Sequence, residues 1–200
     1  LQYFVCSGAN AAAIDTVAEC EAATSEMAYA ANTLTLAITG KSPVTTYYYN
    51  VVVKDLAGNK ALYDGKAQAT TADTTSPTAG TFSASTSVGA TGFTLNWSAA
   101  SDDVTAAASL QYFVCSGANA AAIDTVAECE AATSELAYTA NTLTLAITGK
   151  APTTTYYYNV VVKDAAGNKS LYDGKAETTT ADSTAPTAGT FCGIQGLRRI

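Results

Sequence analysis

Residues 152–162 read Pro-Thr-Thr-Thr-Tyr-Tyr-Tyr-Asn-Val-Val-Val, and residues 43–53 carry a closely similar stretch. Tyr156, Tyr158 and Val160 alternate along it with other residues, which is the two-residue period of a β-strand with one buried face. Aromatic and β-branched residues suit such a pleated, half-buried surface. The stretch therefore predicts a long strand that follows a Pro-containing corner.

Three further stretches of the chain alternate in the same way. Their apolar positions are Phe93, Leu95 and Trp97 in the first, Tyr112 and Val114 in the second, and Leu143, Leu145 and Ile147 in the third. Gly, Pro, Asn and Asp residues bound these stretches and mark turns between them. About seven short strands of this kind predict an all-β fold, a Greek-key β-sandwich of two sheets.

The chain repeats itself at an offset of 109 residues. Residues 1–73 align with residues 110–182, and eight of the 73 aligned pairs differ. A repeat of this length matches one independently folding sandwich rather than a solenoid unit. We therefore expect a partial repeat at residues 1–75 that lacks its first two strands, a complete domain at 76–182, and the start of a third repeat with an aberrant tail at 183–200.

Together these stretches resemble the fibronectin type III pattern. That family has a lone Trp on its second strand, a Tyr-x-Val on its third and a Tyr-rich strand after a Pro-containing corner. Trp97, residues 112–114 and residues 152–162 match these positions. Residues 164–168, Asp-Ala-Ala-Gly-Asn, match a turn found in relatives from bacterial secreted and cell-surface proteins. The resemblance implies a fibronectin type III or immunoglobulin-like sandwich.

The resemblance also implies two weaknesses. Lys41 and Lys150 stand where the family usually places a Leu two residues before the corner Pro, so we expect weaker packing at that corner. Residues 1–73 would lack the Trp strand at the centre of its sheet. A sandwich without that strand exposes an apolar face and open edges, so we expect this part to be marginally stable alone.

Composition excludes several classes of function. The net charge of −7 and the scattered lysines argue against nucleic acid as a partner, and no apolar run is long enough to insert in a membrane. The chain has no histidine, which excludes Ser-His and Cys-His nucleophile pairs and His-bound metals. Asp102 and Asp103 have no facing acidic pair to share acid–base chemistry. We therefore expect no enzymatic activity.

The cysteines recur with the repeat. Cys6 and Cys20 are 14 residues apart and recur as Cys115 and Cys129. An even pair in each copy predicts one local disulfide per repeat, and hence an oxidising, extracellular location. Residues 125–128, Thr-Val-Ala-Glu, have the capping-box pattern of a short helix that would fold back over the strand. Two free buried thiols remain the alternative, because spacing alone does not bring sulfur atoms together.

Oxygen-bearing side chains occur in three segments that meet at one pole of a type III sandwich. They are Asp73, Asp102, Asp103, Asp164 and Asn168. Carboxylate and amide oxygens suit a hard cation, so calcium is the one cofactor we consider. The alternative is that residues 164–168 form a tight hairpin turn and that the acidic pair keeps a loop soluble.

Three apolar side chains are expected on the outer face of the sheet. If Tyr112 and Tyr156 face the core, then Phe113, Tyr157 and Val161 face outward on neighbouring strands. They could form a contact surface for sugar rings or for a protein partner. The alternative is that the Ala-rich segment at residues 117–140 packs over them.

These observations predict a non-catalytic extracellular module, a spacer, adhesion or protein-interaction repeat of a surface or secreted protein. Its expected partners are neighbouring repeats of the same chain and an extracellular protein or glycan. One alternative is an accessory carbohydrate-binding or linker domain of a secreted polysaccharide-active enzyme. A second alternative is a stalk repeat rigidified by calcium.

Overall fold

The computed structural model describes residues 1–190, and the aberrant tail expected at 192–200, with Cys192, lies outside this range. We call residues 1–73 the first repeat and residues 76–182 the second repeat. The first contains β1 (Gln2–Gly8), η1 (Ala11–Ile14), α1 (Val17–Ala22), β2 (Thr24–Ala31), β3 (Thr46–Lys54), β4 (Lys60–Leu62) and β5 (Lys66–Ala69). The second contains β6 (Phe93–Asn96), η2 (Ala107–Ser109), β7 (Gln111–Gly117), η3 (Ala120–Ala122), α2 (Val126–Ala131), β8 (Thr133–Ala140), β9 (Thr144–Ile147), β10 (Thr155–Lys163), β11 (Lys169–Leu171) and β12 (Lys175–Thr178).

The chain forms two compact units. One holds residues 1–76 together with the loops 102–106 and 164–168, and the other holds most of the second repeat. Each loop is hydrogen-bonded to the segment at residues 73–76: the Thr75 hydroxyl donates to Asp103, and Asn168 donates to the carbonyl of Asp73. Among residues 1–190, no helix has the length and apolar character needed to cross a bilayer.

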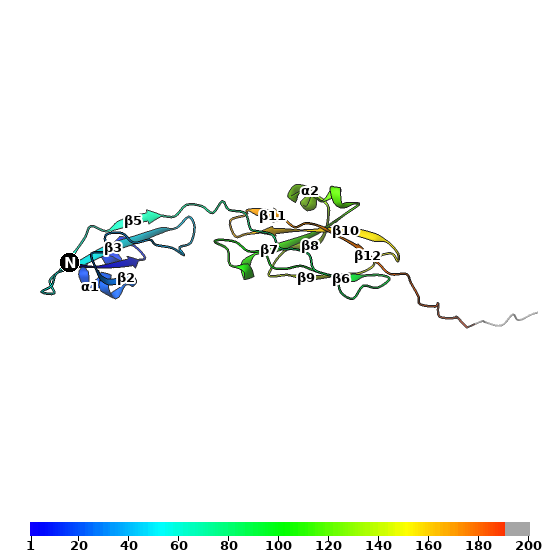
Figure 1. The fold of residues 1–200 in the computed structure, drawn as a ribbon, viewed down its shortest axis with the longest axis horizontal. Helices are drawn as coiled ribbons and strands as arrows, with labels where there is room; N and C mark the ends of the chain where they lie inside the picture. The colour runs from blue at the N-terminus through cyan, green and yellow to red at the C-terminus, as the bar shows by residue number, and fades with distance from the viewer. Residues whose placement is uncertain (191–200) are drawn as a thin grey trace, which may run out of the picture. The chain divides into compact units, whose positions relative to one another are not determined.

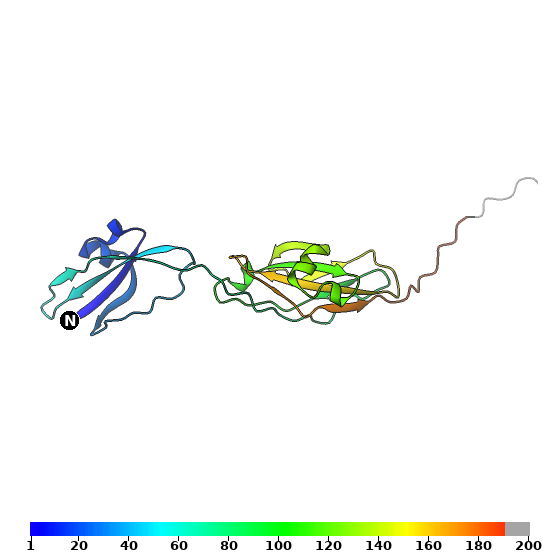
Figure 2. The same cartoon turned by 90° about the horizontal axis from the view of Figure 1, so that it is seen from above.

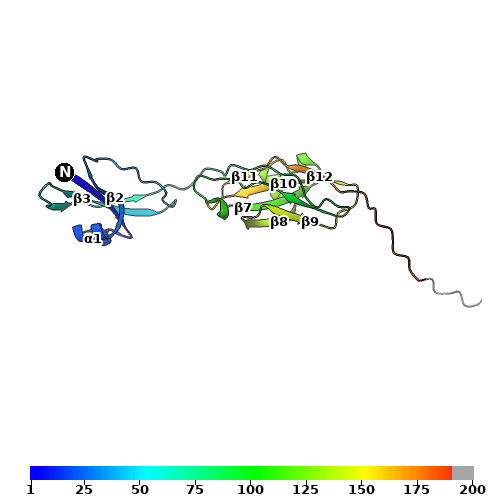
Figure 3. The same cartoon turned by 60° about the horizontal axis from the view of Figure 1, so that its bottom comes forward.

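The second repeat is the predicted Greek-key sandwich. One sheet has the order β11-β10-β7-β8, with β12 also paired to β10, and the other consists of β6 and β9 (Figures 1 and 3). An extended segment at residues 78–86 adds bridges to this second sheet, including one from Phe82 to Trp97. The order, with two sheets of antiparallel strands, is that of a fibronectin type III-like fold.

The core of the second repeat lies between its two sheets. Its central residues are Phe93, Leu95, Trp97, Leu110, Tyr112, Val114, Ile147, Tyr158, Val160, Val162 and Tyr172. The inward alternation predicted from the sequence is therefore confirmed for each strand. Phe82 adds edge-on contacts to the rings of Trp97 and Tyr172, with centroids 6.3 and 6.1 Å apart. Aromatic pairs with this geometry add to the stability gained from buried area.

The outer face of the β7–β10 sheet is covered as well. Helix α2 begins with the predicted capping box: the Thr125 hydroxyl accepts from the Glu128 amide at 3.2 Å, and the Glu128 carboxylate accepts from the Thr125 amide at 3.1 Å. The helix and the segment before it bury Phe113, Ile123 and Val161. Strands β7 and β10 are consequently buried on both faces.

The first repeat has an equivalent sheet. A helical segment covers one face of this sheet, as in the second repeat, but the other face is uncovered. Its sheet has the order β2-β1-β3-β4, and α1 packs over Phe4, Ile14 and Val52. Residues 33–38 form no strand, and Figure 2 shows the connection between β2 and β3 as a line without an arrow. The sheet face opposite α1 therefore has no second sheet from residues 1–73 to pack against.

Candidate functional site

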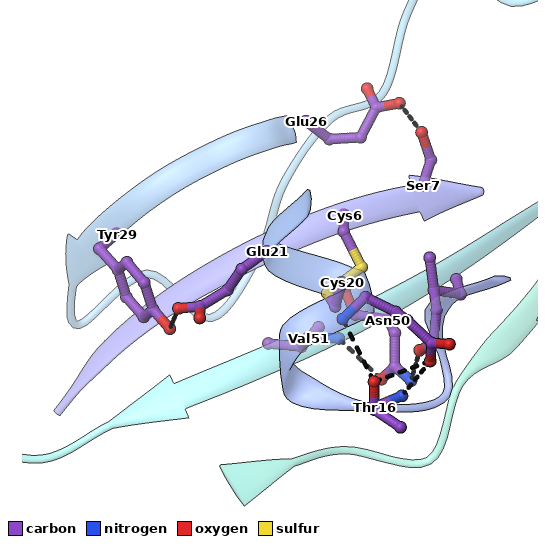
Figure 4. The surroundings of a disulfide bond; sticks show 11 residues. Cys6, Ser7, Thr16, Cys20, Glu21, Glu26, Tyr29, Asn50 and Val51 are labelled. Atoms are coloured by element: carbon purple, nitrogen blue, oxygen red, sulfur yellow. Dashed lines mark hydrogen bonds between the residues drawn. A yellow bond between two sulfur atoms is a disulfide. The ribbon is translucent and has the colours of Figure 1, made fainter. Parts of the chain in front are cut away.

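A disulfide fastens the helical segment to the sheet in each repeat. The sulfur atoms of Cys6 and Cys20 are bonded at 2.03 Å (Figure 4), and those of Cys115 and Cys129 are bonded at 2.04 Å. All four side chains are completely buried. The predicted pairing is thus the one in the structure, rather than two free thiols. Such bonds form and persist in oxidising compartments.

A buried asparagine beside each disulfide holds the chain next to the helix. Asn50 donates from Nδ2 to the carbonyl of Ile14 at 2.9 Å, and its Oδ1 accepts from the amide of Val51 at 2.8 Å. Asn159 makes the same bond to Ile123 at 2.9 Å. These bonds satisfy polar groups that burial would otherwise leave unpaired. The asparagine therefore has a structural role that its sequence position did not reveal.

The lysine that departs from the family pattern has a defined role in the second repeat. Lys150 Nζ lies 3.0 Å from a carboxylate oxygen of Glu135 and 5.1 Å from the centroid of the Tyr156 ring. A lysine stem can cover apolar surface while its ammonium group makes a cation–π contact. Lys150 thus makes an ion pair and a cation–π contact at the corner in place of the apolar packing of a leucine.

A second ion pair joins the helix to a neighbouring strand in each repeat. Glu130 of α2 pairs with Lys169 of β11, and Glu21 of α1 pairs with Lys60 of β4. Lys169 Nζ and the Tyr138 hydroxyl each lie 2.6 Å from Glu130 Oε1, and both donate to it. The Lys169 hydrogen bond, followed by the one from Tyr138, lowers the pKa of Glu130 below its usual value. Burial, followed by the bond to Glu21, raises the pKa of Tyr29 in the first repeat to about 12.

Three of the five residues predicted to bind a cation come together. One carboxylate oxygen from each of Asp73, Asp102 and Asp164 lies within 4.8 Å of the other two. The three residues come from the segment after β5, the loop after Trp97 and the turn after β10. Asp164 is 3% exposed, and the other two are half-buried. The cluster is therefore a real convergence of chain segments rather than a run of acidic residues.

Two carboxylate oxygens in the cluster have no hydrogen-bond donor. Asp102 Oδ2 accepts from the amides of Val104 and Thr105 at 3.1 and 2.7 Å, but its Oδ1 is buried without a partner. Asp73 Oδ1 accepts from the Thr75 amide at 3.0 Å, and its Oδ2 is likewise buried and unpaired. None of the ion pairs among residues 1–190 involves these carboxylates. Buried anionic oxygens without partners are energetically costly.

The remaining two predicted ligands have other positions. Asp103 is exposed and accepts from the Thr75 hydroxyl at 3.3 Å, outside the cluster. Asn168 uses its Nδ2 to donate to Asp164 Oδ2 at 2.8 Å and to the carbonyl of Asp73 at 3.3 Å. It therefore positions two members of the cluster instead of joining them as an oxygen ligand.

The turn at residues 164–168 also has the tight local structure of the alternative interpretation. Asp164 Oδ1 accepts from the amides of Gly167 and Asn168 at 2.6 and 2.8 Å. Gly167 has a φ of +100°, a conformation that favours glycine. The first repeat forms the same turn at Asp55 without the other two carboxylates nearby, so the turn alone does not make the cluster.

The predicted outer contact surface is not a surface in the second repeat. Val161 is completely buried, and Phe113 is 9% exposed beneath the segment that carries α2. The Phe113 ring packs against Tyr138 with centroids 5.3 Å apart. Tyr157 is half-buried and contacts this cluster from its edge. The structure therefore has the covering that the sequence left open as the alternative.

A groove on the second repeat uses residues that the sequence reasoning missed. It encloses about 580 Å³, and Tyr157 lines it together with Asp124, Asp173 and Lys175. The sequence signal for this groove is Gly174, which lies between Asp173 and Lys175. Its φ of +71° in the structure favours glycine and turns the chain there. The groove is lined by three tyrosines, Tyr157, Tyr158 and Tyr172, and by three charged residues within one unit.

The chain is similar in sequence to parts of three bacterial enzymes. It is 32% identical to Endoglucanase B of Cellulomonas fimi over 73% of this chain and 13% of the enzyme. It is 34% identical to Chitinase A1 of Niallia circulans over 75% of this chain and 20% of the enzyme. For Exoglucanase B of Cellulomonas fimi, the identity is 31% over 78% of this chain and 13% of the enzyme. The chain thus spans a fifth or less of these curated relatives.

Comparisons with structures gave fibronectin type III domains, and no family model matches the chain. The sixth fibronectin type III domain of human fibronectin type III domain containing protein 3 has 21% identity and a TM-score of 0.42, covering 59% of this chain and 98% of that domain. The central fibronectin-III array of RIM-binding protein has 15% identity and a TM-score of 0.34, covering 92% of this chain and 58% of that array.

Proposed function

We propose that this chain, built of fibronectin type III-like repeats, is a non-catalytic extracellular module that links or spaces parts of a larger protein. The observation that carries the proposal is the pattern of sequence similarity. Most of this chain matches polysaccharide-active enzymes, yet the match covers 13% to 20% of each enzyme. A stretch of this share suits an accessory or linker region beside a catalytic domain.

The chemistry of the repeats supports this role. A disulfide in each repeat suits a secreted protein. The chain has no histidine that could activate a serine or cysteine nucleophile. Folded domains of this kind are joined in series by short polar linkers. Such a series sets the distance between its flanking domains without any catalytic activity. Neighbouring repeats are therefore the proposed partners, ahead of any soluble ligand.

The proposal is tested by incubating the full chain with carboxymethylcellulose and with colloidal chitin. We expect no release of reducing sugar, because neither polymer meets a pair of catalytic groups. We also expect no co-sedimentation with insoluble cellulose or chitin above that of an inert protein. Sugar release would contradict a non-catalytic role.

Co-sedimentation would instead favour the alternative of a carbohydrate-binding accessory module. The variant Tyr157→Ala separates that alternative from nonspecific adhesion, since Tyr157 lines the groove beside Asp173 and Lys175. Sugar rings stack on aromatic side chains in such sites. Retention that is lost in Tyr157→Ala but kept in Val44→Ala, an exposed side chain of the first repeat outside both grooves, would replace the spacer role by glycan binding.

A second candidate function is a repeat that calcium rigidifies. The observation in its favour is the pair of buried, unpaired oxygens on Asp73 and Asp102 beside the buried carboxylate of Asp164. Calcium takes six to eight oxygen ligands from carboxylates, carbonyls and water. An ion there would neutralise the mutual repulsion of three carboxylates and hold residues 73–76 against the two loops.

Thermal unfolding in millimolar calcium and in a chelator tests this candidate. Calcium binding to the folded state should raise the midpoint by roughly a few degrees. Asp102→Asn should abolish the rise, while Asp103→Asn should keep it, because Asp103 lies outside the cluster. An equal midpoint in calcium and chelator would eliminate the candidate.

A further inference from the structure

The groove of about 580 Å³ on the second repeat has walls from two separate parts of the chain. One wall is the helical segment at residues 120–124, which lies over the outer face of the sheet. The other wall is the bend at residues 172–174, where the edge of the sheet is interrupted between β11 and β12. On β10, Asn159 donates to a carbonyl of the first wall and Val160 accepts from an amide of the second, both at 2.9 Å. Both walls are therefore fastened to the same strand.

One aromatic ring is available to a ligand in this groove. Tyr158 and Tyr172 also line it, but their side chains belong to the core between the sheets and are 0% and 3% exposed. Tyr157 is half-buried, and its neighbours across the sheet are Gly117 and Ala176. Both neighbours are too small to cover its ring. A tyrosine in this setting presents a flat apolar face with a polar tip.

The gap beside the Tyr157 ring follows from close packing. A Cβ atom on Gly117 would lie 2.7 Å from Cγ2 of Ile123, which is closer than side chains approach one another. A larger residue at that position, able to cover the ring, is therefore excluded. On the other side of Tyr157, the methyl group of Ala176 is exposed and leaves room for a ligand.

The groove carries a net negative charge. Asp124 of the first wall and Asp173 of the second are exposed, and neither belongs to an ion pair among residues 1–190. Lys175 is already engaged, because its Nζ donates to the carbonyl of Ser83 at 3.1 Å and lies 3.6 Å from Oε2 of Glu177. Two carboxylates without a cationic partner therefore flank one aromatic ring.

A third carboxylate adds to this charge. A hydrogen bond with Glu128, followed by the repulsion between the two carboxylates, raises the pKa of Asp124 above its usual value. A nearby positive charge favours the ionised form of a carboxyl group. A cationic ligand would therefore relieve the repulsion at this wall, whereas an anionic ligand would increase it.

The backbone around the groove argues against an extended peptide as the ligand. Peptides that add to a sheet need an edge with free main-chain groups. Strand β10 is paired on both sides, with β7 along one edge and with β11 and β12 along the other. Recognition in the groove has to come from a ring face and from charge. A sugar ring that carries an ammonium group matches both.

We propose that this groove binds a cationic amino sugar, with a sugar ring on Tyr157 and ammonium groups paired with Asp124 and Asp173. The ligand class is a glucosamine polymer whose amino groups are free. Neutral cellulose and chitin have the rings without the positive charge. The inference goes beyond the proposed linker role and rests on it only for the extracellular setting in which such a polymer would be met.

The experiment titrates the nitrogen-15-labelled full chain with a glucosamine hexamer, at a pH at which the sugar amine is protonated. We expect saturable shifts of the amide signals of residues 120–124 and 172–176. The acetylated hexamer keeps the rings but loses the charge, and a lysine hexamer keeps the charge but has no rings. Each should bind at least roughly tenfold more weakly. Equal binding by either one would overturn the assignment to a cationic sugar.

Variants that fill the gap beside the ring test the place of binding. The first repeat has the same residue at every lining position, 109 residues earlier, so each change is made in both repeats. Ala67→Leu with Ala176→Leu adds bulk at exposed positions and should abolish the shifts. Ala31→Leu with Ala140→Leu adds the same bulk at exposed positions outside the groove and should keep them. Unchanged binding by the first pair would overturn the proposal.

Variants that remove charge test the groove without changing its packing. Asp64→Asn with Asp173→Asn should weaken binding of the glucosamine hexamer about fivefold, the range of one exposed charge contact. Asp103→Asn with Asp182→Asn removes the same charge outside the groove and should bind as the unchanged chain does. Equal weakening by the two pairs would show that net charge alone attracts the sugar and would overturn the site.

Chromatography of the titrated samples separates this test from that of the proposed function. Sugars shorter than the hexamer would contradict the non-catalytic role. An intact hexamer that shifts no amide signal would overturn the amino-sugar site and leave the linker role standing.

Discussion

Residues 33–38 and residues 142–147 have the same sequence, Thr-Leu-Thr-Leu-Ala-Ile, yet only the second set contains a strand. In the second repeat, residues 144–147 pair with β6. In the first repeat, the same residues run past an open groove. Intrinsic preference is equal in the two places, so the partner strand decides. Strand propensity here measures fit against a neighbour more than a property of the backbone.

The helix and disulfide of each repeat, in contrast, form in the same way in both repeats. Thr16 and Glu19 form a capping box with the same 3.2 and 3.1 Å bonds as Thr125 and Glu128. Both disulfides have a Cα–Cα distance of 5.4 Å. All partners of these elements lie within the duplicated sequence. Local contacts therefore survive in both repeats, whereas the second sheet requires a segment that only one repeat has.

The largest expected effect comes from removing the covering side chain itself. Trp97→Ala should destabilise the second repeat by roughly 3–5 kcal/mol, because it leaves a cavity in a core where Trp97 is 3% exposed. Residues 142–147 should then exchange amide hydrogens as fast as residues 33–38. Urea unfolding followed by hydrogen exchange measures both. A loss below about 1 kcal/mol would show that the cover is not what separates the repeats.

The next effect compares the two disulfides. Closing a loop of about 15 residues contributes roughly 3 kcal/mol in each repeat. Replacing Cys6 and Cys20 by Ser should unfold the first repeat, which has one covered sheet face. Replacing Cys115 and Cys129 should leave the second repeat folded, with a lower midpoint in urea. A first repeat that stays folded without its disulfide would show that the packing on its single covered face is enough to keep it folded.

A smaller difference is expected between the two matching turns. Asp164 is buried and receives three hydrogen bonds from its own turn, whereas Asp55 receives two and is half-buried. Asp164→Ala should cost roughly 1–3 kcal/mol, since it removes three hydrogen bonds to a buried carboxylate, and Asp55→Ala should cost less. Chemical denaturation of the two variants gives the comparison. Equal losses would indicate that burial at this turn is unimportant.

The smallest effect is a dependence on pH. The hydrogen bonds from Lys169 and Tyr138 lower the pKa of Glu130 in the folded state, so its contribution is present above the unfolded pKa near 4.3. It is lost as the pH falls through the lower folded pKa. The contribution of a partly exposed pair is no more than about 1 kcal/mol. Glu130→Gln should reduce the acid sensitivity of the second repeat between about pH 5 and pH 3, measured by urea midpoints. An unchanged pH profile would contradict the assignment.

The sequence predicts most of the second repeat because its patterns are short-range. Alternation gives the inward positions of Leu95 and Val160, and the spacing of Cys115 and Cys129 fits the disulfide. The burial of Phe113 and Val161 could not be predicted from alternation. Alternation assigns a side chain to a face of a sheet but says nothing of what lies over that face, and here α2 does.

The acidic cluster shows the same limit at the level of a site. Loop position in a resembling fold brings Asp73, Asp102 and Asp164 together correctly. It does not distinguish them from Asp103, one residue away, which points to solvent. It also does not reveal that Asn168 donates from its amide. These outcomes depend on side-chain direction within a loop, which has no periodic signal to read.

The near-identity of the two sheet faces has a consequence for synthesis on the ribosome. Residues 1–73 are made before residues 77–101, and β7 and β10 are made later still. The segment at residues 77–101 covers the β7–β10 sheet in the second repeat, and the first repeat carries a near-copy of that sheet face. The nascent segment can therefore pair with the near-copy before its own partner strands exist. Tandem duplication thereby builds a kinetic competitor into the folding pathway, of the kind that causes misassembly in repeat proteins.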